Sequence, residues 1–328
     1  MRKREIKLNG KIMKKIFYIY LLITISFIIP VNGQFKVLNT EKLISEDGQI
    51  FMSPVWSPDA SMIAFTSAGY KGIWIINLQT KNVKLITDET AAGFAFKWSD
   101  DSKSILTRVA RYEGIRRYNA VKIFNVETGE SSLLTDYRTM MPGLPEFASA
   151  DEKIFIYGRN QLEIFDSGIE AKPVKKLNAS QKIVYLRDDK IAVEDLTTNE
   201  LDVFEPVKSA RVLNIQVSPD DNKIAFEIIG GNMYSMNVDG TGLLDLGIGY
   251  RPNWSPDNRY IVYMITEDDG HQILSTDIYT IKIDGTEKTN LTNSDNKLEM
   301  NPTWSPDGKK IAYDVFDEGA IYIIVIGH

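Results

Sequence analysis

The chain has 328 residues, 43% of them hydrophobic, which is enough for two average domains or one large all-β domain. It contains no cysteine, which excludes disulfides, thiolate metal sites, a cysteine nucleophile and a lipoprotein anchor. Residues 1–33 hold seven basic residues and one acidic residue, so the remainder has 31 basic and 43 acidic residues, a net charge near −12. A surface of that charge disfavours nucleic acid as a partner.

Residues 1–33 have the pattern of a secretory signal peptide. A basic stretch precedes the apolar residues 16–30, and small residues at 31–33 predict cleavage after Gly33. We therefore expect a periplasmic or secreted protein, with residues 34–328 as its folded domain and no membrane span after cleavage. Two alternatives remain: translation starting at Met13, or an uncleaved anchor, although the apolar run of 15 residues is shorter than the roughly 20 that a span needs.

A short phrase recurs along the rest of the chain. Trp-Ser-Pro-Asp begins at Trp56, Trp254 and Trp304, with looser copies at Trp98 and Val217, and each copy is followed by an apolar run. Proline presets φ at the second position of a tight turn and Asp suits the next position, so each phrase predicts a turn between two strands. A phrase that repeats every few dozen residues indicates a repeat architecture.

The first copy shows the repeating unit. Strand-like runs at residues 55–57, 63–66, 73–78 and 83–87 are short, rich in β-branched and aromatic residues, and separated by turn formers. Four antiparallel strands in about 40 residues are typical of one blade of a β-propeller.

Counting the copies predicts an all-β fold with a single propeller of seven blades. The expected first strands are marked by Trp56, Trp98, Phe147, Tyr185, Val217, Trp254 and Trp304. The third and fourth copies are degenerate, and the interval from Tyr185 to Val217 leaves little room for a fourth strand, so six blades is the alternative. The last copy supplies three strands, and residues 42–45 resemble residues 84–87, which predicts that an N-terminal strand completes the last blade and closes the ring.

These residues carry a family resemblance. The Trp-Ser-Pro-Asp phrase followed by Lys-Ile-Ala-Tyr, with Asp-Gly-Thr turns at Asp239 and Asp284, resembles the repeat of TolB-like, WD-type β-propellers over roughly residues 40–326. The resemblance implies the propeller part alone, because TolB carries a separate α/β domain before its propeller and only about 20 residues separate Gly33 from Trp56 here. Propellers host many unrelated activities, so the resemblance implies a fold more than a function.

Catalytic motifs are scarce in this sequence. With two histidines, His271 and His328, a multi-histidine metal site within one chain is excluded, and no nucleophile elbow or nucleotide-binding glycine pattern occurs. We therefore expect no enzymatic activity, no cofactor and no metal. The repeated Trp and Asp residues are interpreted as structural: Trp56, Trp98, Trp254, Trp304, Asp59, Asp257 and Asp307.

The candidate binding residues lie in segments that share no repeat pattern. The connection between strands two and three of the second blade is basic and aromatic on an otherwise acidic protein, and we expect it to be a loop. Further candidates lie in the next connection and just before Trp254, which marks the first strand of the sixth blade. The predicted binding residues are Arg111, Tyr112, Arg116, Arg117, Tyr137, Arg138, Tyr250 and Arg251. Residues 267–272 form an acidic counterpart in the sixth blade, where Asp268, Asp269 and His271 are a weaker candidate cation site.

The sequence thus favours an exported, non-catalytic scaffold that binds a protein of the cell envelope. Arginine and tyrosine suit both protein interfaces and sugars, so a carbohydrate-binding or lyase-like propeller is the alternative. We expect the protein to be monomeric.

Overall fold

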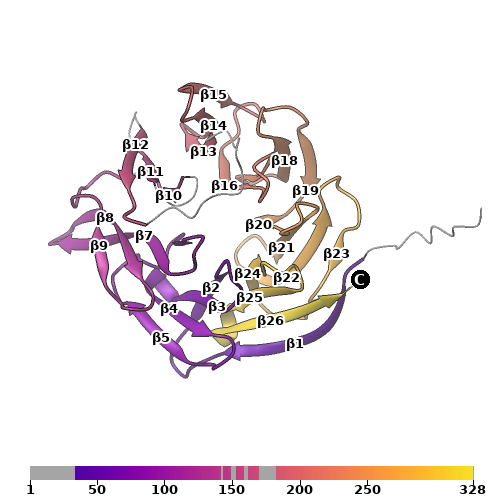
Figure 1. The fold of residues 1–328 in the computed structure, drawn as a ribbon. Helices are drawn as coiled ribbons and strands as arrows, with labels where there is room; N and C mark the ends of the chain where they lie inside the picture. Colours follow the sequence, from indigo (N-terminus) through magenta and orange to yellow (C-terminus); the bar gives the residue numbers. More distant parts are fainter. Residues whose placement is uncertain (1–33, 142, 149–152, 159–161, 170–181, 328) are drawn as a thin grey trace, which may run out of the picture. The chain divides into compact units, whose positions relative to one another are not determined.

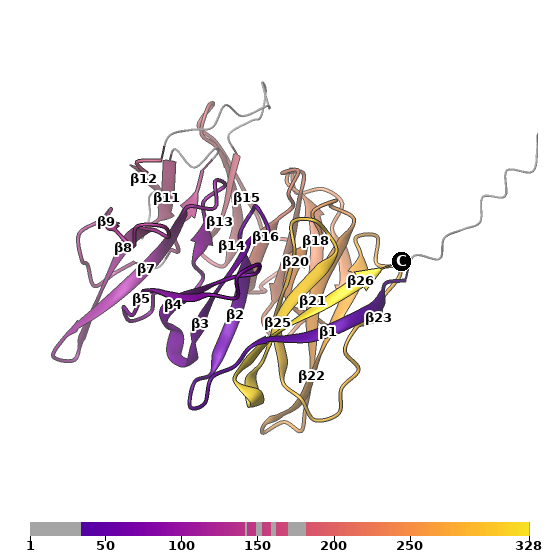
Figure 2. The ribbon, with the colours of Figure 1, turned by 60° about the horizontal axis from the view of Figure 1, so that its bottom comes forward.

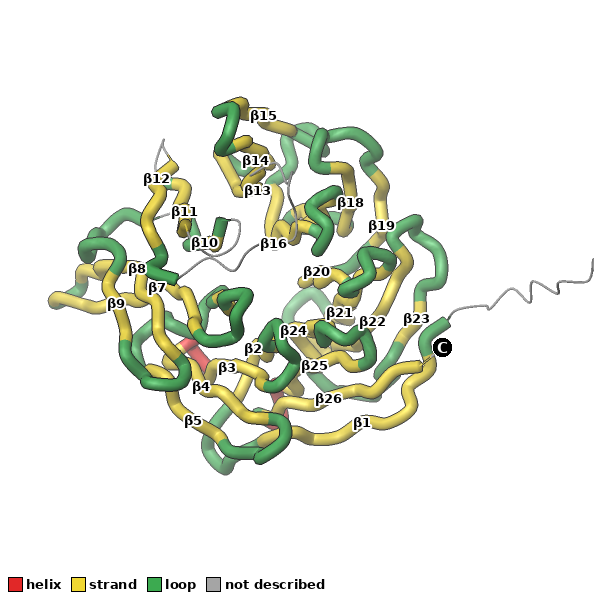
Figure 3. The backbone as a smooth tube through the Cα atoms, in the orientation of Figure 1, coloured by secondary structure: helices red, strands yellow, loops and turns green. Residues whose placement is uncertain are grey.

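The computed structural model describes residues 34–141, 143–148, 153–158, 162–169 and 182–327. The expected signal peptide lies outside the described residues. The described chain forms one compact unit, Gln34–His328, built of antiparallel sheets around a propeller ring (Figure 1). Strands and short connections alternate around this ring (Figure 3). No helix among the described residues is long and apolar enough to span a membrane.

The strands fall into seven sheets, which we number as blades in chain order. Blades 1 and 2 contain β2 (Phe51–Trp56), β3 (Met62–Ser67), β4 (Lys71–Asn77), β5 (Val83–Thr87), β6 (Lys97–Trp98), β7 (Ser104–Glu113), β8 (Arg116–Asn125) and β9 (Ser131–Leu133). Blades 3 and 4 contain β10 (Glu146–Phe147), β11 (Lys153–Tyr157), β12 (Leu162–Asp166), β13 (Lys182–Arg187), β14 (Lys190–Asp195) and β15 (Glu200–Phe204).

The second half of the ring is more regular. Blades 5 and 6 contain β16 (Val212–Val217), β17 (Lys223–Ile228), β18 (Met233–Asn237), β19 (Leu244–Gly247), β20 (Tyr250–Trp254), β21 (Tyr260–Asp268), β22 (Ile273–Lys282) and β23 (Thr289–Asn290). Blade 7 contains β24 (Glu299–Trp304), β25 (Lys310–Val315), β26 (Ala320–Gly327) and β1 (Lys36–Ile44). Two 3₁₀ turns, η1 (Ala68–Tyr70) and η3 (Phe316–Glu318), connect the second and third strands of blades 1 and 7.

The N-terminal strand closes the ring, which confirms the prediction. β1 pairs antiparallel with β26 from Lys36 opposite Gly327 to Ile44 opposite Ile321, and the indigo and yellow strands run side by side in Figure 1. Phe35, just before β1, packs edge-on against Tyr260 and Trp304, with ring centroids 4.8 and 5.4 Å away. The first strand of the chain therefore joins its last strand and covers an edge that would otherwise be open.

In blade 4 the structure differs from one strand assignment that was predicted from the sequence. The turn after β14 is built on Asp195, whose carbonyl accepts the N–H of Asn199 at 2.8 Å, as the carbonyl of Asn77 accepts the N–H of Lys81 in the turn between the third and fourth strands of blade 1. Ile191 of β14 packs toward blade 5, as third-strand residues of other blades do. β13, β14 and β15 thus match second, third and fourth strands, and the assignment of Tyr185 to a first strand is wrong.

The error arises because a short sequence in this third strand resembles the start of a second strand. Lys190-Ile191-Ala192 has the same letters as the Lys-Ile-Ala that begins second strands, although it lies in a third strand. Blades 3 and 4 each show three strands among the described residues. The described residues form seven separate sheets, which excludes the six-blade alternative.

Trp residues of the phrase link adjacent blades. The indole N–H of Trp98 donates to the carbonyl of Val55 at 3.2 Å, that of Trp56 to Thr303 at 3.3 Å, and that of Trp254 to Gln216 at 3.0 Å. In each case the acceptor lies on the first strand of the preceding blade. The rings fill the cores between blades, where apolar side chains from both neighbours meet.

The Ser and Asp of the phrase organise its turn. In the first copy, the Ser57 hydroxyl donates to the Asp59 carboxylate at 2.6 Å and accepts the N–H of Met62 at 2.9 Å. The same Ser-to-Asp distance recurs in the four other copies, at Asp101, Asp220, Asp257 and Asp307. The carboxylates are therefore held by their own turns, facing local donors.

Candidate binding surface

The second and third strands of blade 2 form a hairpin that extends beyond the ring body. β7 and β8 have ten residues each, whereas the second strands of blades 1, 3, 4, 5 and 7 have five or six. Figure 2 shows this hairpin projecting away from the sheets behind it. Residues 111–117 are exposed on both faces, and Ile115 at the turn is fully exposed. We call residues 111–117 the basic hairpin.

The predicted loop is therefore a continuous antiparallel ladder. Pairing runs without a break from Ser104 opposite Asn125 to Glu113 opposite Arg116. Alternation places Arg111, Glu113, Arg116 and Tyr118 on one face of the ribbon. Arg111 lies 4.1 Å above the ring of Tyr137 and forms an ion pair with Glu113 at 3.1 Å.

The opposite face of the ribbon carries Tyr112 directly across from Arg117. Arg117 donates from Nε to the Asn119 side chain at 3.0 Å, which holds its guanidinium along the ribbon. Tyr112 is 57% exposed. A guanidinium beside an exposed aromatic ring is a pair that protein interfaces use often.

The base of the hairpin is fixed to blade 3. Arg108 donates to the carbonyl of Met141 at 2.9 Å and to that of Gly143 at 3.4 Å. Burial, and then the nearby charge of Arg117, lower the pKa of Arg108 from its usual value. Arg138 and Asn119 exchange two backbone hydrogen bonds of 2.9 and 2.8 Å, so the segment after β9 runs along the hairpin. The projecting end thus stands on a rigid support.

Arg138 lies at a pocket beside the hairpin. Its Nη1 bonds both oxygens of Glu163, at 2.7 and 2.9 Å. The pocket has a volume of about 470 Å³ and its lining combines acidic, basic and apolar groups: Leu133, Leu134, Thr135, Asp136, Arg138, Glu163 and Phe165. Arg111, Tyr112, Arg116, Arg117, Tyr137 and Arg138 are therefore grouped at blades 2 and 3.

Tyr250 and Arg251 belong to a different part of the ring. Tyr250 packs against the core between blades 6 and 7. Arg251 has a left-handed backbone, and its N–H donates to the buried carboxylate of Glu227 in blade 5. Its guanidinium also approaches the side chain of Asn214 in blade 5 at 3.4 Å. Tyr250 and Arg251 therefore lie apart from the six predicted binding residues at blades 2 and 3.

Three buried carboxylates, Glu227, Glu299 and Asp314, were not predicted from the sequence, and Glu227 and Asp314 accept hydrogen bonds across a blade boundary. Glu227 accepts from Asn214 of its own blade at 2.8 Å and from the backbone of Arg251 in the next blade. Asp314 accepts from Asn301 of its own blade at 2.9 Å and from the backbone N–H of Ser53 in blade 1 at 2.8 Å. Both follow the Ile-Ala-aromatic run of a second strand, which is the signal that identifies the position.

The acidic connection of blade 6 is also a long hairpin. β21 and β22 pair out to Asp268 opposite Ile273, and residues 267–274 are exposed. Asp268 and Asp269 cap backbone N–H groups of the turn itself, at 2.9 Å each. We call residues 267–274 the acidic hairpin. Among the described residues, no group of three or more His, Asp or Glu side chains is placed to hold a metal.

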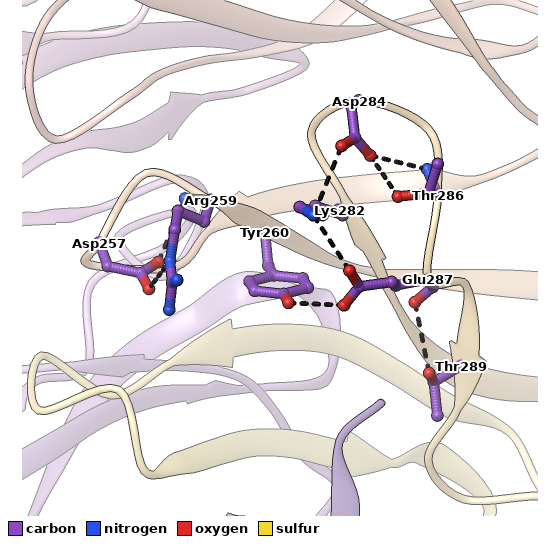
Figure 4. Close-up of polar contacts among 8 residues, drawn as sticks. All are labelled: Asp257, Arg259, Tyr260, Lys282, Asp284, Thr286, Glu287 and Thr289. Carbon is purple, nitrogen blue, oxygen red and sulfur yellow. Dashed lines mark hydrogen bonds and ion pairs between the residues drawn. The ribbon is translucent and has the colours of Figure 1, made fainter. Parts of the chain in front are cut away.

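Charged groups at the other end of blade 6 form local networks (Figure 4). Arg259 donates to Asp257 at 2.7 Å, Lys282 lies 3.0 Å from Glu287, and the hydroxyl of Tyr260 donates to Glu287 at 2.7 Å. Asp284 accepts the N–H of Thr286 at 3.0 Å. These charged side chains of the repeat are held by their near neighbours within blade 6.

Comparison with known proteins gives a likeness of fold. No family model matches the chain, and no curated protein matches it in sequence. TolB from Acinetobacter baumannii is similar at 18% identity and a TM-score of 0.53, over 80% of this chain and 59% of that one. A putative TolB from Agrobacterium tumefaciens is similar at 16% identity and 0.54, over 90% and 99%.

A propeller from another context is also similar. The β-propeller domain of Cps50 (Swd1) from Myceliophteria thermophila has 10% identity and a TM-score of 0.60, over 89% of this chain and all of that domain. The chain thus spans 59% of the length of the Acinetobacter protein and all or nearly all of the other two. Identities this low show the fold alone. The fold of this protein is that of the TolB-like and WD-type β-propellers.

Proposed function

We propose that this protein is an exported, non-catalytic propeller that binds another protein through the basic hairpin and its neighbours at blade 3. The observation that carries the proposal is the arrangement of Arg111, Arg116 and Arg117 on a projecting ribbon of a domain whose net charge is near −12. The partner that fits this hairpin is a protein with an acidic surface. Other faces of the propeller are acidic, so like charge disfavours contacts between them.

The physical support is a combination of rigidity and exposed chemistry. The ladder fixes the arginines in space, so little conformational entropy is lost when they bind. Tyr112 and Ile115 supply apolar area at the tip, and the arginines supply donors in fork geometry for carboxylates.

The test compares two variants with the same change in net charge. Arg111→Glu, Arg116→Glu and Arg117→Glu together reverse the hairpin, whereas Lys71→Glu, Lys103→Glu and Lys208→Glu reverse three exposed lysines elsewhere. Each is immobilised and used to capture proteins from an envelope extract. We expect the hairpin variant to lose the partner that the lysine variant and the wild type retain.

The melting temperature of both variants should stay close to that of the wild type, because the substituted side chains are exposed. Equal capture by the two variants would overturn the proposal. Loss of binding to an anionic polysaccharide by the hairpin variant, without a protein partner, would favour the carbohydrate-binding alternative.

A further inference from the structure

Blades 2 and 6 carry matched extensions. Their second strands, β7 and β21, have ten and nine residues, and each continues into a ten-residue third strand. Second strands run in the same direction in every blade, so these two turns lie on one face of the ring. Figure 2 shows both hairpins reaching to the same side.

The two extensions are opposite in charge and alike in exposed apolar content. The basic hairpin has three arginines against one glutamate, whereas the acidic hairpin has Glu267, Asp268 and Asp269 with no Lys or Arg. Ile115 is fully exposed on the first, and Ile273 and Leu274 are 45% and 46% exposed on the second. Each hairpin thus provides the charge and apolar surface that the other lacks.

Their positions in the ring meet a symmetry condition. In a ring of seven blades, a two-fold axis that lies in the plane of the face and passes through blade 4 exchanges blade 2 with blade 6. Two copies related by this axis place each basic hairpin against the acidic hairpin of the other copy. An interface of this kind is isologous and closed, and it makes the same contact twice.

We propose that the protein forms a face-to-face two-fold dimer, joined by two contacts between the basic hairpin of one copy and the acidic hairpin of the other. The inference rests on the proposed role of the basic hairpin in recognition, and it names a second copy of this chain as a partner. It differs from the expectation of a monomer. The two contacts act together, because forming one brings the other pair into register.

The test uses charge reversal at each hairpin and sedimentation equilibrium as the readout. One variant carries Arg111→Glu, Arg116→Glu and Arg117→Glu. The other carries Glu267→Lys, Asp268→Lys and Asp269→Lys. Each alone places like charges at both contacts of a dimer, so we expect its dissociation constant to rise at least about tenfold above that of the wild type.

An equimolar mixture of the two variants is the decisive sample. In the mixed dimer both contacts pair opposite charges again, so its dissociation constant should return to near the wild-type value. A chain carrying all six substitutions has the net charge of the wild type and should also dimerise. The variant with Lys71, Lys103 and Lys208 reversed controls for net charge and should dimerise like the wild type.

Three results would overturn the dimer: a wild type that stays monomeric at high concentration, a mixture that does not associate, or open chains in place of a closed dimer. The proposed function fails separately. A monomeric wild type that captures an envelope protein through its arginines retains that function and excludes the dimer. If the dimer forms but capture of an envelope protein does not depend on the arginines, the dimer is retained and the proposed function is excluded.

Discussion

At the scale of single residues, three polar side chains of second strands connect neighbouring blades. Asp314 reaches Ser53, Glu227 reaches Arg251, and Arg108 reaches the carbonyl of Met141. In two of these contacts the recipient has a positive φ, 54° at Ser53 and 56° at Arg251, within a bulge of the first strand. The carboxylate therefore satisfies a backbone N–H that the bulge removes from the ladder.

Asp314 gives the first prediction, a pH-dependent one. Burial raises the pKa of Asp314 from 3.8 to about 7, although hydrogen bonds from Asn301 and Ser53 oppose the shift. Because the folded state holds this proton more tightly than the unfolded state, the contribution of Asp314 to stability falls as pH rises from about 4 to about 7. Asp314→Asn removes that loss and keeps an acceptor for Ser53.

The measurement is urea unfolding of the wild type and Asp314→Asn at several pH values. Relative to the variant, the wild type should lose stability with a slope of up to about 1.4 kcal/mol per pH unit below pH 7. Burial raises the pKa of Glu227 and Glu299 as well, so only the difference between the two proteins isolates Asp314. Exposed Asp47→Asn is the matched control, and an equally flat difference for both substitutions would contradict the assignment.

The tryptophans give a second prediction at this scale. Trp254 donates its indole N–H across the blade boundary at 3.0 Å, whereas the buried indole N–H of Trp304 has no acceptor among the described residues. Trp254→Phe removes packing and leaves the carbonyl of Gln216 without its donor, while Trp304→Phe also removes a buried unsatisfied group. We expect Trp254→Phe to lower the free energy of unfolding by about 1–2 kcal/mol more than Trp304→Phe does. Equal costs would show that the bond contributes little.

At the scale of elements, β1 is the strand that the N-terminal region adds to the last blade. Its anchor is Phe35, which is buried against Tyr260 and Trp304, whereas the neighbouring Leu38 is 67% exposed. Phe35→Ala should lower the unfolding free energy by about 3–5 kcal/mol, and Leu38→Ala by less than about 0.5 kcal/mol. Chemical denaturation of the two variants measures this, and a small effect of Phe35→Ala would mean that β1 closes the ring without its anchor.

The same scale shows why the hairpins were interpreted as loops. Residues 111–117 show no alternation of apolar and polar residues, because the distal ladder faces water on both sides and has no buried face. The position of the connection along the chain was right, but strand pairing reduces the expected loop to the turn at residues 114–115. Its ladder depends on backbone pairing. The side-chain pattern indicates such pairing only where one face of the ladder is buried.

At the scale of the whole molecule, the repeat predicted the fold. Trp56, Trp98, Trp254 and Trp304 each lie in a first strand, and the closure by the N-terminal strand is confirmed. The failure lies where the phrase is weak: Tyr185 was assigned to the wrong strand because the sequence around it resembles that of another strand.

The central claim, that recognition occurs at the basic hairpin, is tested most directly by site-specific cross-linking. A photoreactive residue replaces fully exposed Ile115 in one protein and Leu85, exposed on outer strand β5, in a control. After irradiation in envelope extract, we expect adducts from position 115 and few from position 85, and reversal of Arg111, Arg116 and Arg117 should suppress the adducts. Equal adduct yields from both positions, or adducts from position 115 that survive the reversal, would contradict it.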